Sequence, residues 1–294
     1  VGTVFTIHNI AFQGVAPANL VETRGIDRGD FIEQGLEYWG QISALKAGLR
    51  WADQITTVRP SYAAELTTPE FGMGMEGLLR AREHDLTGIL NGVDTSAWDP
   101  ATDAAIAAYK TPKGKARNKK RLRKDFGLPE TDGPLAVVAA RLSHQKGLDV
   151  LLDALPALVD RGGQLVLLGT GDPALEAKFR AEAEHPNVAV HIGYDEALSH
   201  RVIAGGDAIL IPSRFEPCGL TQMYGLRYGT IPVVARTGGL VDTVIDASPA
   251  ARRAGVATGL QFGPETAHAL ATALLRLVAL NRDAQTWAQM QKNA

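Results

Sequence analysis

The chain has 294 residues, of which 45% are hydrophobic and 21% are charged, and its formal net charge is −2. A chain of this length favours about two domains and can bury a sizeable core. The small net charge excludes the broad basic field of an obligate nucleic-acid-binding protein, so we expect no nucleic-acid partner.

The N-terminal part alternates strand and helix patterns and ends at a turn. The predicted elements are a strand at 1–8, a helix at 36–53, a strand at 54–58, a helix from Pro60 and a strand that begins at 86. Asn-Gly turn chemistry follows the last strand at Asn91. We therefore place a domain boundary near Asn91–Ser96, which divides the chain into residues 1–91 and 92–294.

A basic helix is predicted over Lys113–Phe126, after a segment rich in Asp, Ala and Pro. Eight of the twelve residues Lys113–Lys124 are basic. We interpret them as the solvated face of a helix rather than a nucleic-acid site, because the charges are local and no aromatic residues are interleaved with them.

Beyond Pro134, strand and helix patterns alternate regularly. The predicted strands are 135–142, 164–172, 188–194, 207–213 and 231–235. Strands separated by helices are typical of βαβ units and predict a parallel sheet. The near-continuous Val, Ile and Leu content of these strands predicts a sheet covered on both faces, so the fold class is α/β.

Parallel sheets bind ligands at the carboxyl ends of their strands, where this sequence places charged, aromatic and glycine residues. They are Arg141 and Lys146, Gly169–Asp172, Gly193 and Tyr194, the stretch Ser213–Gln222, and Arg236–Leu240. Arginine and lysine supply full positive charges, and glycines let backbone N–H groups approach an anion. Each feature alone has a structural explanation. Their repetition at successive strand ends indicates a phosphorylated ligand of the nucleotide class.

The single cysteine, Cys218, excludes an internal disulfide and fits a reducing compartment. The sequence has no signal peptide, and no apolar run approaches the roughly 18 residues of a membrane-spanning helix. We therefore expect a cytoplasmic protein with no membrane partner. Both chain ends fall inside predicted elements, so we also expect a fragment of a longer protein.

Five stretches resemble the bacterial glycogen synthases and the related starch synthases. They are TIHNIAFQG (6–14), GILNGVD (88–94), ARLSHQKGLD (140–149), IGYDEALSHR (192–201) and the long stretch 212–244. The resemblance runs from Thr3 to about Trp287. The long stretch, PSRFEPCGLTQMYGLRYGTIPVVARTGGLVDTV, is the most specific of the five, because its order and spacing match over more than thirty residues.

The resemblance implies a B-type glycosyltransferase fold with two Rossmann-like domains. The first would be an incomplete acceptor-side domain, and the second a nucleotide-sugar-binding domain whose terminal helix is truncated. The implied reaction transfers glucose from ADP-glucose to the non-reducing 4-OH of an α-1,4-glucan, with retention at the anomeric carbon. No metal or other cofactor is implied.

The resemblance also implies roles for individual residues. Arg141 and Lys146 would hold the diphosphate and stabilise its charge as it leaves. Glu216 would contact the glucosyl hydroxyls, and His8 would reach the glucosyl unit from the first domain, with its backbone carbonyl near the anomeric centre. The remaining substrate-binding residues would be Asn91 near the hinge, Tyr194 stacked on adenine, and Cys218, Gly219, Leu220 and Thr221 against sugar and phosphate.

The sequence departs from the family pattern at two places. Many retaining transferases of this fold carry a second Glu eight residues after the first; here Tyr224 stands there, as in bacterial glycogen synthases. A Lys-Thr-Gly-Gly-Leu loop of the family is expected before Val1 and is absent. Two alternatives stay open: a retaining transferase that uses UDP-glucose, and a non-catalytic nucleotide- or glucan-binding fragment. The sequence leaves the oligomeric state open.

Overall fold

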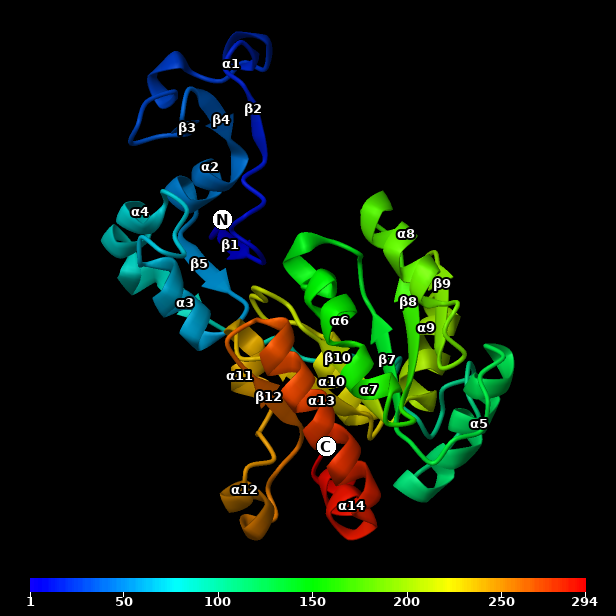
Figure 1. Cartoon of the computed structure of the whole chain (residues 1–294). Helices are drawn as coiled ribbons and strands as arrows, with labels where there is room; N and C mark the ends of the chain where they lie inside the picture. Colours follow the sequence, from blue (N-terminus) through cyan, green and yellow to red (C-terminus); the bar gives the residue numbers. More distant parts are fainter. The chain divides into compact units, whose positions relative to one another are not determined.

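The computed structural model describes residues 1–294, which form two compact units, Val1–Gly92 and Val93–Ala294. Both units combine strands and helices, as Figure 1 shows. None of the helices is long and apolar enough to cross a bilayer.

The first unit contains a parallel sheet of order β1-β5-β6 and a small antiparallel sheet of order β2-β4-β3. Its strands are β1 (Val4–Ile7), β2 (Val15–Pro17), β3 (Glu37–Tyr38), β4 (Gln41–Ser43), β5 (Gln54–Thr57) and β6 (Leu86–Gly88). Its helical segments are α1 (Leu20–Thr23), η1 (Arg28–Asp30), α2 (Ala44–Trp51), α3 (Pro60–Leu66), α4 (Glu76–Ala81) and η2 (Glu83–Asp85).

The helix predicted at 36–53 is wrong over its first half, which forms the hairpin β3–β4. Gly40 takes a φ of +76°, a conformation that glycine adopts without steric cost, and lets the chain turn back. Ser43 then caps α2 by accepting a hydrogen bond from the Lys46 backbone N–H at 3.0 Å. The helix therefore begins only at Ala44.

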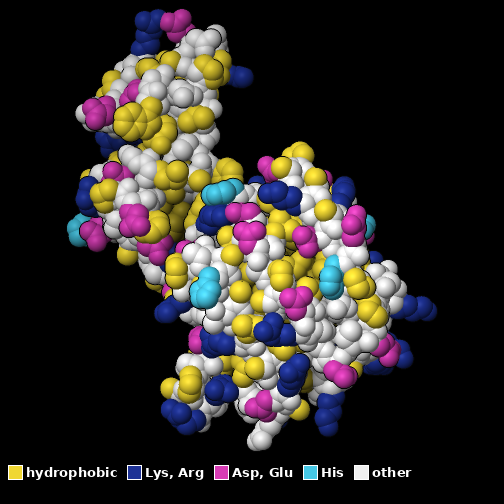
Figure 2. Space-filling view, in the orientation of Figure 1, with side chains coloured by type: hydrophobic (Ala, Val, Ile, Leu, Met, Phe, Trp, Pro, Cys, Tyr) yellow, Lys and Arg dark blue, Asp and Glu magenta, His cyan; other side chains and the backbone are white.

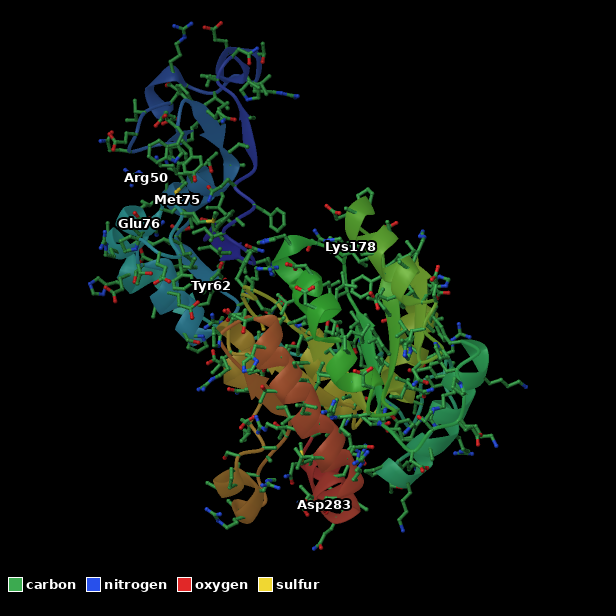
Figure 3. All side chains as sticks on the ribbon, viewed as in Figure 1. Arg50, Tyr62, Met75, Glu76, Lys178 and Asp283 are labelled. Carbon is green, nitrogen blue, oxygen red and sulfur yellow. The ribbon has the colours of Figure 1, made fainter.

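The chain around His8 is fixed by contacts on both sides. The Thr57 hydroxyl donates to the Ile7 carbonyl at 2.8 Å, and the Ile10 N–H donates to the Tyr62 hydroxyl at 3.3 Å. Tyr62 is buried on α3, where Figure 3 labels it, and burial raises its pKa. The exposed His8 thus stands on a short, anchored segment after β1.

The second unit is built on a six-stranded sheet of order β12-β11-β10-β7-β8-β9 in which every neighbouring pair is parallel, as predicted. Its strands are β7 (Leu135–Ala139), β8 (Gln164–Gly169), β9 (Val188–Ile192), β10 (Ala208–Ile211), β11 (Ile231–Ala235) and β12 (Leu260–Phe262). Its helical segments are η3 (Pro112–Lys115), α5 (Ala116–Asp125), η4 (His144–Lys146), α6 (Leu148–Ala154), α7 (Pro156–Val159), α8 (Pro173–Glu182), α9 (Glu196–Gly205), α10 (Thr221–Arg227), α11 (Gly238–Thr243), α12 (Pro249–Ala254), α13 (Ala267–Arg282) and α14 (Ala284–Asn293).

Helices cover both faces of this sheet. Side chains alternate along β7: Ala136 and Val138 join an apolar cluster with α6, α7 and α13, whereas Leu135 and Val137 join a cluster with α5, α9 and α11. Figure 1 shows α6, α7 and α13 together on one face. On the face of this unit visible in Figure 2, Lys and Arg side chains are interspersed with Asp and Glu.

A stack of three rings packs Trp98, which follows the Gly92 boundary, against helices α9 and α10 of the same unit. Trp98 lies between His200 of α9, at a centroid distance of 3.9 Å, and Tyr224 of α10, at 3.8 Å. Asp103 accepts a hydrogen bond from the Tyr228 hydroxyl at 2.6 Å and lies 2.7 Å from His200 Nδ1. Burial raises the pKa of Asp103, but these hydrogen bonds outweigh it and hold the pKa below its usual value.

The basic helix is not simply a solvated face, and that interpretation is corrected here. The Lys115 side chain is buried, and its ammonium donates to the Ile203 carbonyl at 3.2 Å, the Ala204 carbonyl at 2.6 Å and the Thr230 hydroxyl at 2.5 Å. Lys119 pairs with Asp207 at 2.6 Å. Lys115 and Lys119 therefore point inward and bond residues at the end of α9 and at the starts of β10 and β11, instead of facing solvent.

Lys115 should make the stability of the protein rise with pH above neutrality. Burial lowers its pKa from 10.5 to about 7 in the folded state. Between these values the unfolded state binds more protons, so the free energy of unfolding increases with pH, by at most about 1.4 kcal/mol per pH unit. Lys115→Met should lose this slope in urea unfolding measured at neutral pH and at about pH 9.

Lys120→Met is the matched control, because Lys120 is exposed on α5, the helix that begins directly after Lys115. It should keep the wild-type slope. Wild-type and Lys115→Met proteins with parallel pH dependence would show that the buried amine titrates as an ordinary lysine.

Candidate functional site

The carboxyl ends of β7, β8 and β9 border a cavity of about 560 Å³. Its lining includes Arg141 after β7, Gly169–Gly171 at the end of β8, and Gly193 and Tyr194 after β9. The Tyr194 side chain is 86% exposed, so its ring is available as a stacking surface. The sheet thus brings two of the predicted residues, Arg141 and Tyr194, to one cavity of a size that suits a nucleoside.

The loop after β8 already holds an anion of its own. Glu176 accepts hydrogen bonds from the Gly171 N–H at 2.9 Å and from the Thr170 hydroxyl at 2.8 Å. The Gly171 N–H and then the Thr170 hydroxyl hold the pKa of this carboxyl below its usual value. These two donors are therefore already engaged by a carboxylate of the protein itself.

Lys146 and Glu216 meet because their strands, β7 and β10, are neighbours in the sheet. The Lys146 ammonium donates to Glu216 Oε2 at 2.5 Å, and the buried Ser213 hydroxyl donates to the same oxygen at 3.1 Å. Glu216 is only 9% exposed, so its carboxyl group lies in a largely dehydrated position, where Lys146 and the Ser213 hydroxyl supply hydrogen bonds in place of water. A ligand at this point would face a cation and a hydrogen-bond acceptor side by side.

The loop that carries Glu216 is supported from inside the protein. The Gly239 N–H of α11 donates to the Glu216 carbonyl at 3.0 Å. The buried Gln222 amide donates to the carbonyls of Cys218 at 3.0 Å and Gly219 at 3.1 Å. These contacts fix the backbone from 216 to 219 and give the loop a defined shape before any ligand binds.

The turn that carries Lys146 lies unusually close to the Glu216 loop. Gly147 has a φ of +62°, and a Cβ atom placed on it would lie 1.9 Å from the Pro212 carbonyl oxygen. No side chain fits there without moving backbone. Glycine at 147 is therefore required both by conformation and by the approach of the two loops.

The remaining predicted residues divide between the two units. Cys218 is buried and Gly219 takes a φ of +74°, while the partly exposed Leu220 precedes Thr221, the first residue of α10. His8 and Asn91 belong to the first unit, where the Asn91 N–H donates to the Val58 carbonyl at 3.2 Å. No three His, Cys, Asp or Glu side chains are grouped so that they could hold a metal ion.

Sequence reasoning missed the residues that hold the site in place. Ser213, Arg214 and Gln222 lie in the stretch 213–222, in which the sequence predicted roles only for Glu216 and for residues 218–221. Asp149 pairs with Arg214 across 65 positions of sequence. No local pattern reports such a pairing, although the adjacency of β7 and β10 in a parallel sheet could have suggested it.

The comparisons with known proteins agree with the motifs. Residues 1–81 match the starch synthase catalytic domain, and residues 118–294 match the glycosyl transferases group 1. The chain is 61% identical over 295 residues to the glycogen synthase of Paracoccus denitrificans and 58% identical over 293 residues to that of a Jannaschia species. These alignments cover 100% and 99% of this chain, which spans 62% of the length of each relative.

A solved structure shows the same fold. The catalytic domain of starch synthase IV from Arabidopsis thaliana, bound to ADP and acarbose, is 35% identical and has a TM-score of 0.92, covering 99% of this chain and 62% of that one. The resemblance inferred from the motifs and the α/β fold of the B-type glycosyltransferases are therefore confirmed.

Gly147→Ala should destabilise the second unit by about 3 kcal/mol or more, because it adds a backbone clash to a left-handed conformation. The matched control is Gly162→Ala. Gly162 has a φ of +79°, but no atom lies within 4 Å of the point where a Cβ would stand, so only the conformational cost of about 1 kcal/mol applies. Urea unfolding of both variants measures the difference. Equal losses would show that the approach to Pro212 is not tight.

Proposed function

Since this chain belongs to the glycosyl transferases group 1 family, we propose that it is part of a retaining hexosyltransferase, a glycogen or starch synthase. The proposed reaction transfers glucose from ADP-glucose to the non-reducing 4-OH of an α-1,4-glucan. One observation carries the proposal: the Lys146 ammonium and the Glu216 carboxylate lie 2.5 Å apart at the rim that also holds the nucleoside-sized cavity. The relatives named glycogen synthase and the starch synthase IV bound to ADP and acarbose support the choice of substrates.

The nucleoside diphosphate occupies the second unit. Adenine stacks on the exposed ring of Tyr194, and the ribose lies in the cavity toward Arg141. Arg141 and Lys146 hold the diphosphate. Their charges act most strongly as the bond to the anomeric carbon breaks, when negative charge collects on the leaving phosphate.

The glucosyl unit lies against the Glu216 loop. The Glu216 carboxylate accepts hydrogen bonds from sugar hydroxyls and holds the ring in its reactive pose. The backbone of Cys218, Gly219 and Leu220 and the hydroxyl of Thr221 complete the contacts with sugar and phosphate. Lys146 bonds Glu216 directly, so the proposal couples the group that holds the sugar to one that holds the leaving diphosphate.

Within the first unit, His8 and Asn91 are the proposed sugar-binding residues, and the backbone carbonyl of His8 is proposed to face the positive charge that develops at the anomeric carbon. The proposed positive charge for the leaving group comes from side chains, without a resident metal or cofactor. We place the protein in the cytoplasm, with ADP-glucose and glucan as its partners and no nucleic-acid or membrane partner.

The two alternatives make different predictions for one experiment. Calorimetry with ADP and with UDP, alongside incorporation of labelled glucose into glycogen from each sugar nucleotide, separates them. Tighter binding of ADP with transfer from ADP-glucose supports the proposal. Preference for UDP supports the UDP-glucose transferase, and binding of ADP without transfer in the full protein supports a non-catalytic module. A folded protein that binds neither nucleotide contradicts the assignment of the rim.

Glu216→Ala should lower the turnover number by orders of magnitude while the protein stays folded, because the sugar loses its main positioning contact. Glu182→Ala, at an exposed position of α8, is the control and should act like wild type. Steady-state glucose transfer in the full protein measures both. Activity of Glu216→Ala within about tenfold of wild type, equivalent to about 1.4 kcal/mol, would rule out a central role.

Arg141→Ala and Lys146→Ala should each depress the transfer rate more than they weaken ADP binding. The physical reason is that the charge they face grows between the bound donor and the transition state. Transfer kinetics and ADP calorimetry on the same samples give the two numbers. An equal fall in both would make these residues ground-state binding groups only.

A further inference from the structure

Arg214, two residues before Glu216, is hydrogen-bonded across the rim through both its side chain and its backbone. Its guanidinium donates to both carboxylate oxygens of Asp149 on α6, from Nη1 to Oδ1 at 2.8 Å and from Nη2 to Oδ2 at 2.6 Å. Nη1 also donates to the His144 carbonyl at 2.7 Å. This is the paired fork geometry that distinguishes arginine from lysine.

The backbone of Arg214 belongs to the same network. The Arg214 N–H donates to the Gln145 carbonyl at 2.9 Å, and the Gln145 amide donates to the Phe215 carbonyl at 3.2 Å. The Thr237 hydroxyl donates to the Arg214 carbonyl at 3.2 Å. One residue thus joins the three loops that follow β7, β10 and β11.

These contacts leave Arg214 poorly suited to hold a ligand itself. Three of the five guanidinium N–H donors are engaged by Asp149 and the His144 carbonyl, so a phosphate that used the paired terminal nitrogens would have to compete with a carboxylate already in place. The hydrogen bonds from Arg214 lower the pKa of Asp149. The pair is partly exposed, with 28% of the Arg214 side chain and 40% of the Asp149 side chain accessible, so its contribution to global stability is small. The pair therefore matters for the relative position of the loops rather than for the global stability of the protein.

The Arg214–Asp149 pair determines how Lys146 and Glu216 lie relative to each other. Lys146 stands in the turn 144–149, and Arg214 bonds both ends of this turn, at the His144 carbonyl and the Asp149 carboxylate. Glu216 follows Arg214 on the opposite loop. We propose that Arg214 and Asp149 form a positioning pair that keeps Lys146 and Glu216 in contact and that does not touch the donor. This inference rests on the proposed function only for the roles of Lys146 and Glu216.

The competing explanation makes Arg214 a diphosphate ligand, which its place at a strand end next to Glu216 would suggest. The two explanations differ in what Asp149 does. A positioning residue acts through Asp149, so removing either partner has the same effect. If Arg214 instead binds the phosphate directly, removing Asp149 would free the N–H donors of Arg214 and leave ADP binding intact or tighter.

The test uses Arg214→Lys, Arg214→Ala, Asp149→Ala and the double alanine variant of the 294-residue chain. Backbone hydrogen exchange of the ligand-free protein should rise about tenfold or more at 214 and in the turn 144–149 for every variant. ADP calorimetry should show affinity reduced by a similar factor, on the order of tenfold, in both single alanine variants and no further in the double variant. Arg214→Lys should fail to restore either property, because lysine lacks the fork.

Arg276→Lys is the matched control. Arg276 Nη2 contacts both carboxylate oxygens of Asp246 at 3.1 Å in the same unit, in a pair with similar exposure that has no hydrogen bond to Arg214 or to the turn 144–149. It should leave exchange at 214 and ADP affinity unchanged. The proposal is overturned if Asp149→Ala behaves like this control, whether or not Arg214→Ala weakens ADP binding. If the wild-type chain does not bind ADP, the proposed function fails, while the exchange measurement still decides whether the pair orders the two loops.

Discussion

The whole site depends on the parallel arrangement of the six strands in the second unit. Because every strand runs the same way, all their carboxyl ends fall on one edge, and loops far apart in sequence become neighbours there. The adjacency of β7 and β10 places Lys146 beside Glu216, and that of β10 and β11 places Gly239 against the Glu216 backbone. The nonpolar clusters on the two faces hold the strands rigid, so the loops inherit a fixed spacing.

Strand order alone does not set distances of a few ångströms between loops. Here the loops are drawn together by hydrogen bonds between backbone and side chains, and by glycines that remove steric obstacles. Gly147 lets one turn approach the Pro212 carbonyl, and Gly239 lets α11 approach Cys218, whose carbonyl oxygen would lie 2.3 Å from an added Cβ. Close backbone contact and the Arg214–Asp149 pair act together, so Lys146 and Glu216 are already in contact in the ligand-free protein.

Strands and rim residues of the second unit could be predicted from the sequence, because buried parallel strands have a strong apolar signal and their ends attract glycine and charge. The hairpin β3–β4 could not, since the apolar spacing of a helix continued across Gly40. Lys115 looked solvated because a run of positive charge conceals which member faces inward. The pairing of Arg214 with Asp149 depends on tertiary structure alone. The domain boundary and the site roles remain predictions, although the structure divides into units at Gly92.

The ring stack at Trp98 makes position 224 depend on two other segments of the chain. Tyr224 occupies the position where many transferases of this fold have a second glutamate, and here its ring lies flat on Trp98, which in turn lies on His200. A glutamate introduced alone would set a carboxylate against an indole face and leave that face without its partner. The loss would therefore be felt in the Trp98 segment and α9 as well as in α10, because all three supply a ring to the stack. A substitution at position 224 is therefore transmitted through Trp98 to His200, so the packing of α9 depends on the residue that α10 presents to the indole ring.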